Sequence, residues 1–181
     1  MPSNKWVSPD GIVHTFGTHD TTTYPGASEG AGVGQFKEVV LKLPDLTLLG
    51  TDATAYTAGN YVTSAKIPGN ATIQEVWITT DTAASSAGAA DLLLGTFTVS
   101  STTKALVAVD ADGLAAAADS ALSDFSVAGE TMILGKAAGA AQLGKTLANA
   151  ADSTTPVVVA ATYVTAAFTA GAVTARIFYT V

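Results

Sequence analysis

The alternation of side chains near the C-terminus constrains the fold more than any other feature of the sequence. Between residues 173 and 181 every second side chain is apolar: Val173, Ala175, Ile177, Tyr179 and Val181. Successive side chains of a strand point to opposite faces, so this spacing places one face against a core. The sequence therefore predicts a strand that runs to Val181 and is held within a sheet.

Other segments also have the composition and length of short strands. About eight β-segments are expected in all, at residues 36–44, 60–67, 71–80, 91–99, 106–109, 131–134, 157–167 and 173–181, with a further one around 143–147. Turns are predicted at residues 68–70, 110–113 and 169–171, where Pro, Gly, Asn and Asp gather. No long helical segment separates the strands, which argues against a doubly wound α/β fold. We therefore predict an all-β fold, an antiparallel β-sandwich with the jelly roll as the expected arrangement.

Residues 71–80 are predicted to form a strand with apolar groups on both faces. Alternation places Ile73, Glu75, Trp77 and Thr79 on one face, and Gln74, Val76, Ile78 and Thr80 on the other. Such a strand packs on a core with one face and is partly covered on the other.

Residues 114–122 are the one segment expected to form a helix. Leu114, Ala118 and Leu122 follow one another at intervals of four in an Ala-rich stretch. This spacing places them on one side of a short helix that packs on the sandwich.

The first 35 residues differ in composition from the rest of the chain. They contain three prolines before position 26 and glycines at positions 26, 30, 32 and 34. Gly leaves the backbone nearly unrestricted, and isolated apolar residues in such a segment tend to dock on a surface. We therefore divide the chain into an extended N-terminal arm, residues 1–35, and a β-sandwich domain, residues 36–181. Trp6, Phe16 and Phe36 are the expected anchors of the arm.

Charge and cysteine content exclude several functional classes. The net charge is −7, and charged residues make up 13% of the chain, against about 25% in an average domain. A protein that binds nucleic acid or an anionic membrane surface needs clustered Lys and Arg, so neither partner is expected. The absence of cysteine excludes disulfides, thiolate zinc ligands and cysteine nucleophiles. A weakly charged surface instead favours contact with another protein, because little desolvation is required.

One octapeptide matches the phosphate-binding loop, but its context does not. Residues 139–146, GAAQLGKT, fit the pattern G-x-x-x-x-G-K-[ST]. Such a loop lies between a strand and a helix and needs an acidic strand end for Mg²⁺. Here residues 135–138 separate it from the preceding strand, and a β-hairpin is expected after it. We interpret the octapeptide as a linker; an NTPase that uses Lys145 is a less favoured hypothesis.

The acidic residues and histidines lack the spacing of metal or catalytic sites. Asp110 and Asp112 begin like a calcium loop, but positions 5 and 12 of that loop hold Leu and Ala. His14 and His19, the two histidines of the chain, both lie in the arm, whereas a metal centre needs three or four converging ligands. The sequence therefore predicts a non-enzymatic protein with no catalytic residue, no metal site and no cofactor.

Several of these segments follow one another in a distinctive order. They are IPGNATI, an alternating strand that carries Trp77, the loop TTDTA, the strand ADLLLGTF, the Ala-rich DGLAAAADSAL and the ending TAGAVTARIFYTV. This order, over residues 37–181, resembles that of small structural proteins of tailed-phage virions. Such proteins use a jelly roll or a related β-sandwich to coat, cement or ornament capsids. The resemblance implies a structural role and no catalytic residues, and it does not extend to the arm.

The leading hypothesis is a capsid decoration or cement protein, made in the host cytoplasm and located on the exterior of the virion. Its expected partners are the major capsid protein and copies of itself, most simply as a trimer. The residues expected to make partner contacts are Trp6, Phe16, Phe36 and Trp77. The alternative is a head-fibre or tail-associated module that binds a host receptor or glycan through Trp77 or Tyr163.

Overall fold

The computed structural model describes residues 5–7, 13–15, 36–51, 63, 66–103, 105–135, 143, 147 and 155–181, and for the first two ranges it describes the backbone alone. Contacts divide the chain into two units, Met1–Gln35 and Phe36–Val181. In the first unit, β1 (Lys5–Val7) pairs antiparallel with β2 (Val13–Thr15), with Trp6 opposite His14. This unit therefore contains paired strands within the segment for which the sequence predicts an extended arm.

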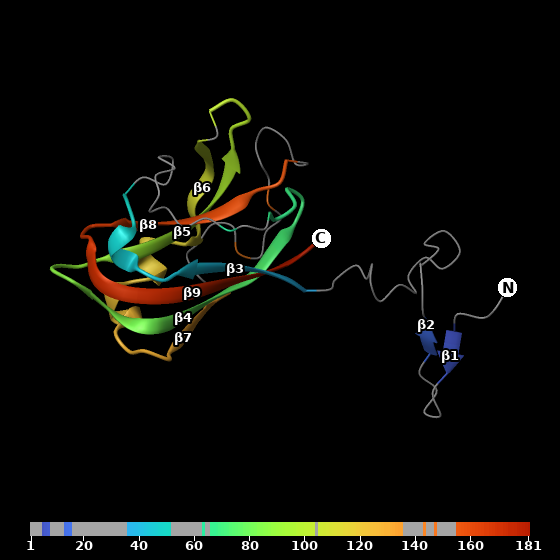
Figure 1. Ribbon diagram of the computed structural model, residues 1–181, viewed down its shortest axis with the longest axis horizontal. Coiled ribbons are helices and arrows are strands. Elements are labelled where there is room, and N and C mark those ends of the chain that lie inside the picture. Colours follow the sequence, from blue (N-terminus) through green and yellow to red (C-terminus); the bar gives the residue numbers. More distant parts are fainter. Residues whose placement is uncertain are drawn as a thin grey trace. The chain divides into compact units, whose positions relative to one another are not determined.

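The second unit is an all-β sandwich of two antiparallel sheets (Figure 1). The four-stranded sheet has the order β3 (Lys37–Leu43), β9 (Phe168–Thr180), β4 (Thr72–Ser86), β7 (Thr131–Leu134). The three-stranded sheet has the order β6 (Leu106–Ala115), β5 (Asp91–Val99), β8 (Val158–Val164). The predicted all-β, antiparallel sandwich is thus confirmed. A jelly roll has two four-stranded sheets, so its eighth strand stays a prediction.

The helical turns of the described residues are short and of the 3₁₀ type. They are η1 (Leu46–Leu48), η2 (Ala117–Asp119) and η3 (Leu122–Phe125). The helix expected at residues 114–122 is therefore wrong. Leu114 and Ala115 belong to β6 and are fully buried, so the chain enters the core there as a strand and turns only afterwards.

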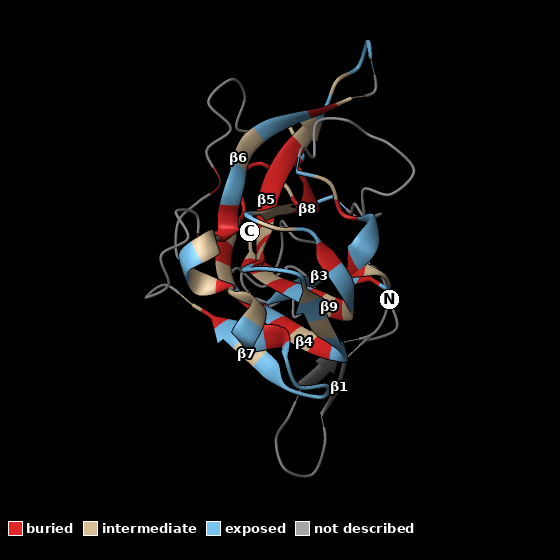
Figure 2. Cartoon of the chain, turned by 90° about the vertical axis from the view of Figure 1, so that its left-hand side faces the viewer, coloured by how far each residue is buried: buried red, intermediate tan, exposed pale blue. Residues whose placement is uncertain are grey.

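One hydrophobic core joins the two sheets, and buried residues lie on strands of both (Figure 2). One cluster of buried side chains joins Leu92 and Leu94 of β5 and Val159 of β8 to residues of β3, β4 and β9. The alternation predicted at the C-terminus is confirmed from Val173 to Thr180, but β9 ends at Thr180 and Val181 is exposed. Of the described β9 residues, Val173, Ala175, Ile177 and Tyr179 are buried, whereas Thr174, Arg176, Phe178 and Thr180 lie on the opposite face.

A β-bulge changes the predicted faces of β4. Ile73 lies opposite Tyr179 and Glu75 opposite Phe178, so Gln74 is an extra residue on the β4 side. Ile73 is consequently buried, together with Val76, instead of sharing a face with Glu75. From Glu75 to Thr80 the predicted alternation holds.

The predicted turn at residues 110–113 lies inside a strand. β6 continues through Asp110 and Gly113, but its pairing with β5 is interrupted, since Leu94 lies opposite Ala115 and Thr96 opposite Asp110. The extra β6 residues arch over Gly95. The predicted turn residues therefore form a large bulge within β6 and do not end the strand.

The predicted C-terminal hairpin is wrong, because β8 lies in the three-stranded sheet and β9 in the four-stranded sheet. Residues 169–171 belong to β9, and residues 165–167 carry the chain from one sheet to the other. In this connection Thr165 has a φ of 72°, in the left-handed region, although the residue is not a glycine.

Candidate interaction surface

The solvent-facing side of the four-stranded sheet is the surface on which exposed apolar side chains gather, and we call it the outer face. Its side chains come from alternate positions of all four strands. They are Glu38, Val40 and Lys42 of β3; Thr174, Arg176 and Phe178 of β9; Glu75, Trp77, Thr79 and Asp81 of β4; and Thr131 and Ile133 of β7.

The register of the strands arranges these side chains in rows across the sheet. Val40 and Trp77 both lie opposite Arg176, and Trp77 also lies opposite Ile133. Val40, Arg176, Trp77 and Ile133 therefore form one row, which we call the central row. Glu38, Phe178 and Glu75 form the neighbouring row on one side.

Three apolar side chains of the central row are open to solvent. Relative exposure is 38% for Val40, 36% for Trp77 and 57% for Ile133. The indole of Trp77 leans on the ring of Phe178, with centroids 5.0 Å apart and planes inclined by 58°. Its Nε1 donates a hydrogen bond to Oε2 of Glu75 at 2.9 Å. The indole is thus held in place while one part of it stays exposed.

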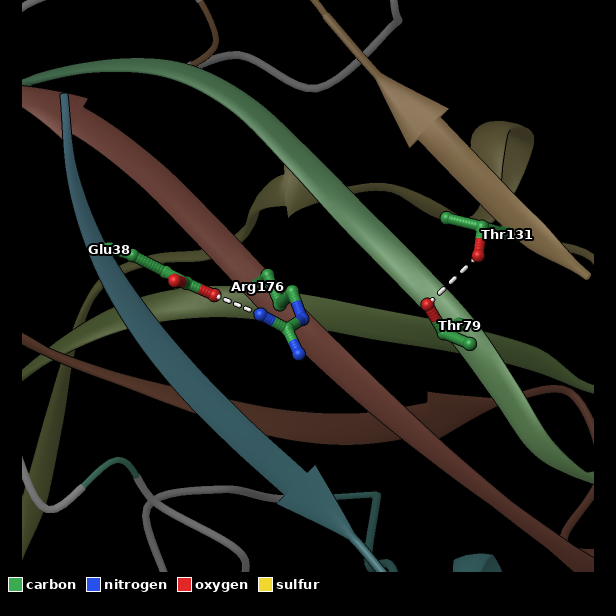
Figure 3. A network of polar contacts seen from close by, with 4 residues as sticks. All are labelled: Glu38, Thr79, Thr131 and Arg176. Atoms are coloured by element: carbon green, nitrogen blue, oxygen red, sulfur yellow. Dashed lines mark hydrogen bonds and ion pairs between the residues drawn. The ribbon is translucent and has the colours of Figure 1, made fainter. Parts of the chain in front are cut away.

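Polar contacts between strands fix the side chains around this row. Arg176 Nη1 donates to Glu38 Oε1 at 2.8 Å, and the hydroxyl oxygens of Thr79 and Thr131 lie 2.9 Å apart (Figure 3). Both pairs lie on the outer face: the first joins β3 to β9, and the second joins β4 to β7.

Of the two predicted contact residues whose side chains are described, Phe36 and Trp77, one lies on this face. Trp77 lies in the central row, whereas Phe36 directly precedes β3 and is 68% exposed. The backbone of Trp6 belongs to β1, and its side chain lies outside the described residues, as does the whole of Phe16. Tyr163, the other aromatic residue considered for glycans, is half-buried and packs against the core.

Sequence reasoning missed the neighbours of Trp77 on the outer face. Val40 and Ile133 lie within the apolar runs VVL and MIL of short strands, and only the order β3-β9-β4-β7 places them in one row with Trp77. The alternation within each strand is visible in the sequence, but the register between strands distant in the sequence is not.

The motifs considered for chemistry do not form a site within the described residues. Asp110 and Asp112 lie on β6, and no group of three or more His, Cys, Asp or Glu is placed to hold a metal ion in the part of the chain that the structure describes. Of residues 139–146, Leu143 alone is described, and it is buried in the core. Among the described helices, none has the length and hydropathy needed to cross a membrane.

Comparisons with known proteins give a distant likeness among solved structures. No protein-family model matches the chain, and no curated protein matches it. Among solved structures, the chain is similar to a chain of the structure described as "Capsid of Ralstonia phage GP4", with 17% identity and a TM-score of 0.47. The match covers 84% of this chain and 88% of the other. At this identity and TM-score the likeness carries no argument about function.

Proposed function

We propose that the protein is a non-enzymatic structural protein of a virion, and specifically a decoration or cement protein on the outside of a phage head. The observation that carries the proposal is the outer face, where a sheet presents Val40, Trp77 and Ile133 to solvent in one row. Trp77 and Ile133 are neighbours in this row, and Arg176 separates them from Val40. Exposed apolar side chains rimmed by polar ones are typical of protein-interaction sites. The resemblance of residues 37–181 to small virion proteins supports the same role.

The proposed mechanism is mechanical. The sandwich binds the major capsid protein as a homo-oligomer, for which the sequence favours a trimer, and the arm contacts a neighbouring subunit through Trp6 and Phe16. Each contact buries apolar side chains that subunit separation would return to water. Because many copies bind one shell, individually weak contacts add up to a strong effect on the stability of the shell.

Heads assembled without the protein provide the test. Purified protein added to such heads should sediment with them to a saturating ratio and raise the temperature at which they release their DNA. Heads that already carry the protein serve as the control, since their sites are occupied. Protein that stays in the supernatant over a concentration series reaching a large molar excess over shell subunits contradicts the proposal.

A glycan-binding head fibre or tail module is the second candidate, because an exposed Trp77 beside Phe178 can stack on sugar rings. The inclination of 58° between the two rings argues against a flat platform for a polysaccharide. A glycan array distinguishes the two functions: binding that is lost in Trp77→Ala supports the second candidate, and a silent array removes it.

A further inference from the structure

Two residues of opposite charge flank the central row on β3, the edge strand of the outer face. Glu38 precedes Val40 by two residues and Lys42 follows Val40 by two. Two residues of a strand span about 6.7 Å, so the backbone positions of Glu38 and Lys42 lie at equal distances on opposite sides of the row. The Glu38 carboxylate itself reaches toward the row, where it accepts a hydrogen bond from Arg176 at 2.8 Å.

This symmetry makes the face complementary to itself. A second copy rotated by 180° about an axis along the central row meets the first with its strands reversed. Glu38 of one copy then faces the partner's Lys42, and Lys42 faces the partner's Glu38. Val40, Trp77 and Ile133 lie on the axis and face their own counterparts, as a two-fold contact requires.

We propose that the outer face of the four-stranded sheet is a two-fold self-association surface, which pairs two copies of the chain sheet to sheet. Facing sheets pack about 10 Å apart, a separation that Trp77 and Ile133 fill and that the Glu38 and Lys42 side chains span from both sides. The pairing uses the outer face that also carries the proposed function, and it is tested on the purified chain alone, so it can fail independently of binding to a phage head.

Electrostatics permit this contact although the chain is acidic. The outer face carries three carboxylates, Glu38, Glu75 and Asp81, and two cations, Lys42 and Arg176, so its charge is 2 − 3 = −1, against −7 for the whole chain. Arg176 lies on the axis, but its guanidinium is already paired with Glu38 at 2.8 Å. Two outer faces therefore approach with little net repulsion, and the Glu38–Lys42 pairs select the antiparallel orientation.

The size of the face predicts a weak dimer. Four strands about 4.8 Å apart, over rows that span about 20 Å, cover roughly 400 Å² per copy. This is about half of what a standard interface buries on each partner. We expect a dissociation constant on the order of 10 μM or above, and a dimer rather than the trimer favoured by the sequence, because a patch that pairs with itself closes with two copies.

Sedimentation velocity of the full chain, over concentrations from about 1 μM to 1 mM, tests the pairing. Lys42→Glu places carboxylate against carboxylate and should raise the dissociation constant at least about tenfold, as should Glu38→Lys. Lys37→Glu is the matched control: it makes the same charge change on β3 but lies opposite the buried Tyr179, at a position that alternates away from the outer face. This control should leave the dimer unchanged.

Mixing the two charge variants gives the sharpest outcome. In a mixed pair, the carboxylate introduced at position 42 of one copy faces the ammonium introduced at position 38 of the other, and the native Glu38 and Lys42 also face each other. Equimolar Lys42→Glu and Glu38→Lys should therefore form mixed dimers, observed by native mass spectrometry with one variant isotope-labelled. Ile133→Asp is a second disruptive variant at a solvent-exposed position, should a β3 variant fail to fold.

Four results would overturn the proposal. They are a wild-type chain that stays monomeric over the whole concentration series, a trimer, a dimer that Lys42→Glu and Ile133→Asp leave intact, and charge variants whose mixture does not dimerise. A monomer that loses binding to phage heads on Lys42→Glu assigns the outer face to the shell instead.

Discussion

Gly95 lies where β6 arches over β5, and the fold leaves no room for a side chain there. A Cβ on Gly95 would lie 2.2 Å from the carbonyl oxygen of Ala111 and 2.5 Å from that of Asp110, both of them backbone atoms. We expect Gly95→Ala to lower the free energy of unfolding by about 3 kcal/mol or more, because the bulge must shift. Denaturant unfolding measures the change. Gly88→Ala is the control, since its Cβ makes an ordinary contact of 3.5 Å with Ala166; equal losses in the two variants would contradict this account.

Thr165 carries backbone strain in the turn between β8 and β9. Its φ of 72° is unfavourable for a β-branched residue, whereas Asn adopts this region readily. We expect Thr165→Asn to raise the free energy of unfolding by about 0.5–1 kcal/mol, although the 3.3 Å hydrogen bond from Thr165 Oγ1 to Asp91 Oδ2 is lost. The same change at Thr169, which lies within β9, should destabilise instead because Asn is disfavoured in strands. Thermal unfolding of both variants checks this: the melting temperature should rise for Thr165→Asn and fall for Thr169→Asn.

At the scale of elements, Ser120 joins the η2–η3 connection to the three-stranded sheet. Its buried hydroxyl lies within hydrogen-bonding distance of the carbonyl oxygens of Leu92 and, at 2.8 Å, Ala116. Its own carbonyl accepts a hydrogen bond from the Leu92 N–H at 3.0 Å. Ser120→Ala should cost about 1–2 kcal/mol of stability, because the one proton that the hydroxyl shares between these carbonyls is lost away from water.

The matched control for this prediction is Ser126→Ala. The Ser126 hydroxyl donates to the Ser123 carbonyl at 2.7 Å but is exposed, so water replaces it. The change in the unfolding free energy should stay within about 0.5 kcal/mol. If Ser120→Ala lowers the free energy of unfolding no more than Ser126→Ala does, the Ser120 hydroxyl does not hold this connection. Hydrogen exchange at the Leu92 amide locates the effect.

Several single strands of this fold follow from the sequence, whereas relations between strands do not. Most residues of the strands expected at 60–67 and 143–147 lie outside the described residues, and Ile67 forms an isolated bridge with Val157. The bounds expected for residues 91–99 and 131–134 match β5 and β7, and alternation sorts the faces of β9 correctly. The bulges at Gln74 and opposite Gly95 could not be predicted, because an extra residue is defined only by its partner strand. For the same reason Trp77 could be named as a contact residue, but its row with Val40 and Ile133 could not.

At the scale of the whole molecule, the described core lies in one contact unit, and the proposed attachment to the phage head lies in the other. The core that joins the two sheets lies within Phe36–Val181, and β3, the first strand of that unit, is paired along its length with β9. Every described side chain of the core therefore follows residue 35. If residues 1–35 act as an arm that binds a neighbouring subunit, their removal should affect binding and leave the fold unchanged.

We therefore expect a chain that lacks residues 1–35 to unfold within about 2 °C of the full chain and to lose binding to phage heads. Thermal unfolding by circular dichroism checks the first outcome, and cosedimentation with heads that lack the protein checks the second. The double variant Trp6→Ala, Phe16→Ala in the full chain tests whether these two side chains are the anchors, because it removes both apolar groups and leaves the length of the arm unchanged. If the truncated chain still saturates the heads, the arm is not the attachment, and the sandwich alone carries the contact. If it unfolds much earlier than the full chain, the first unit stabilises the second.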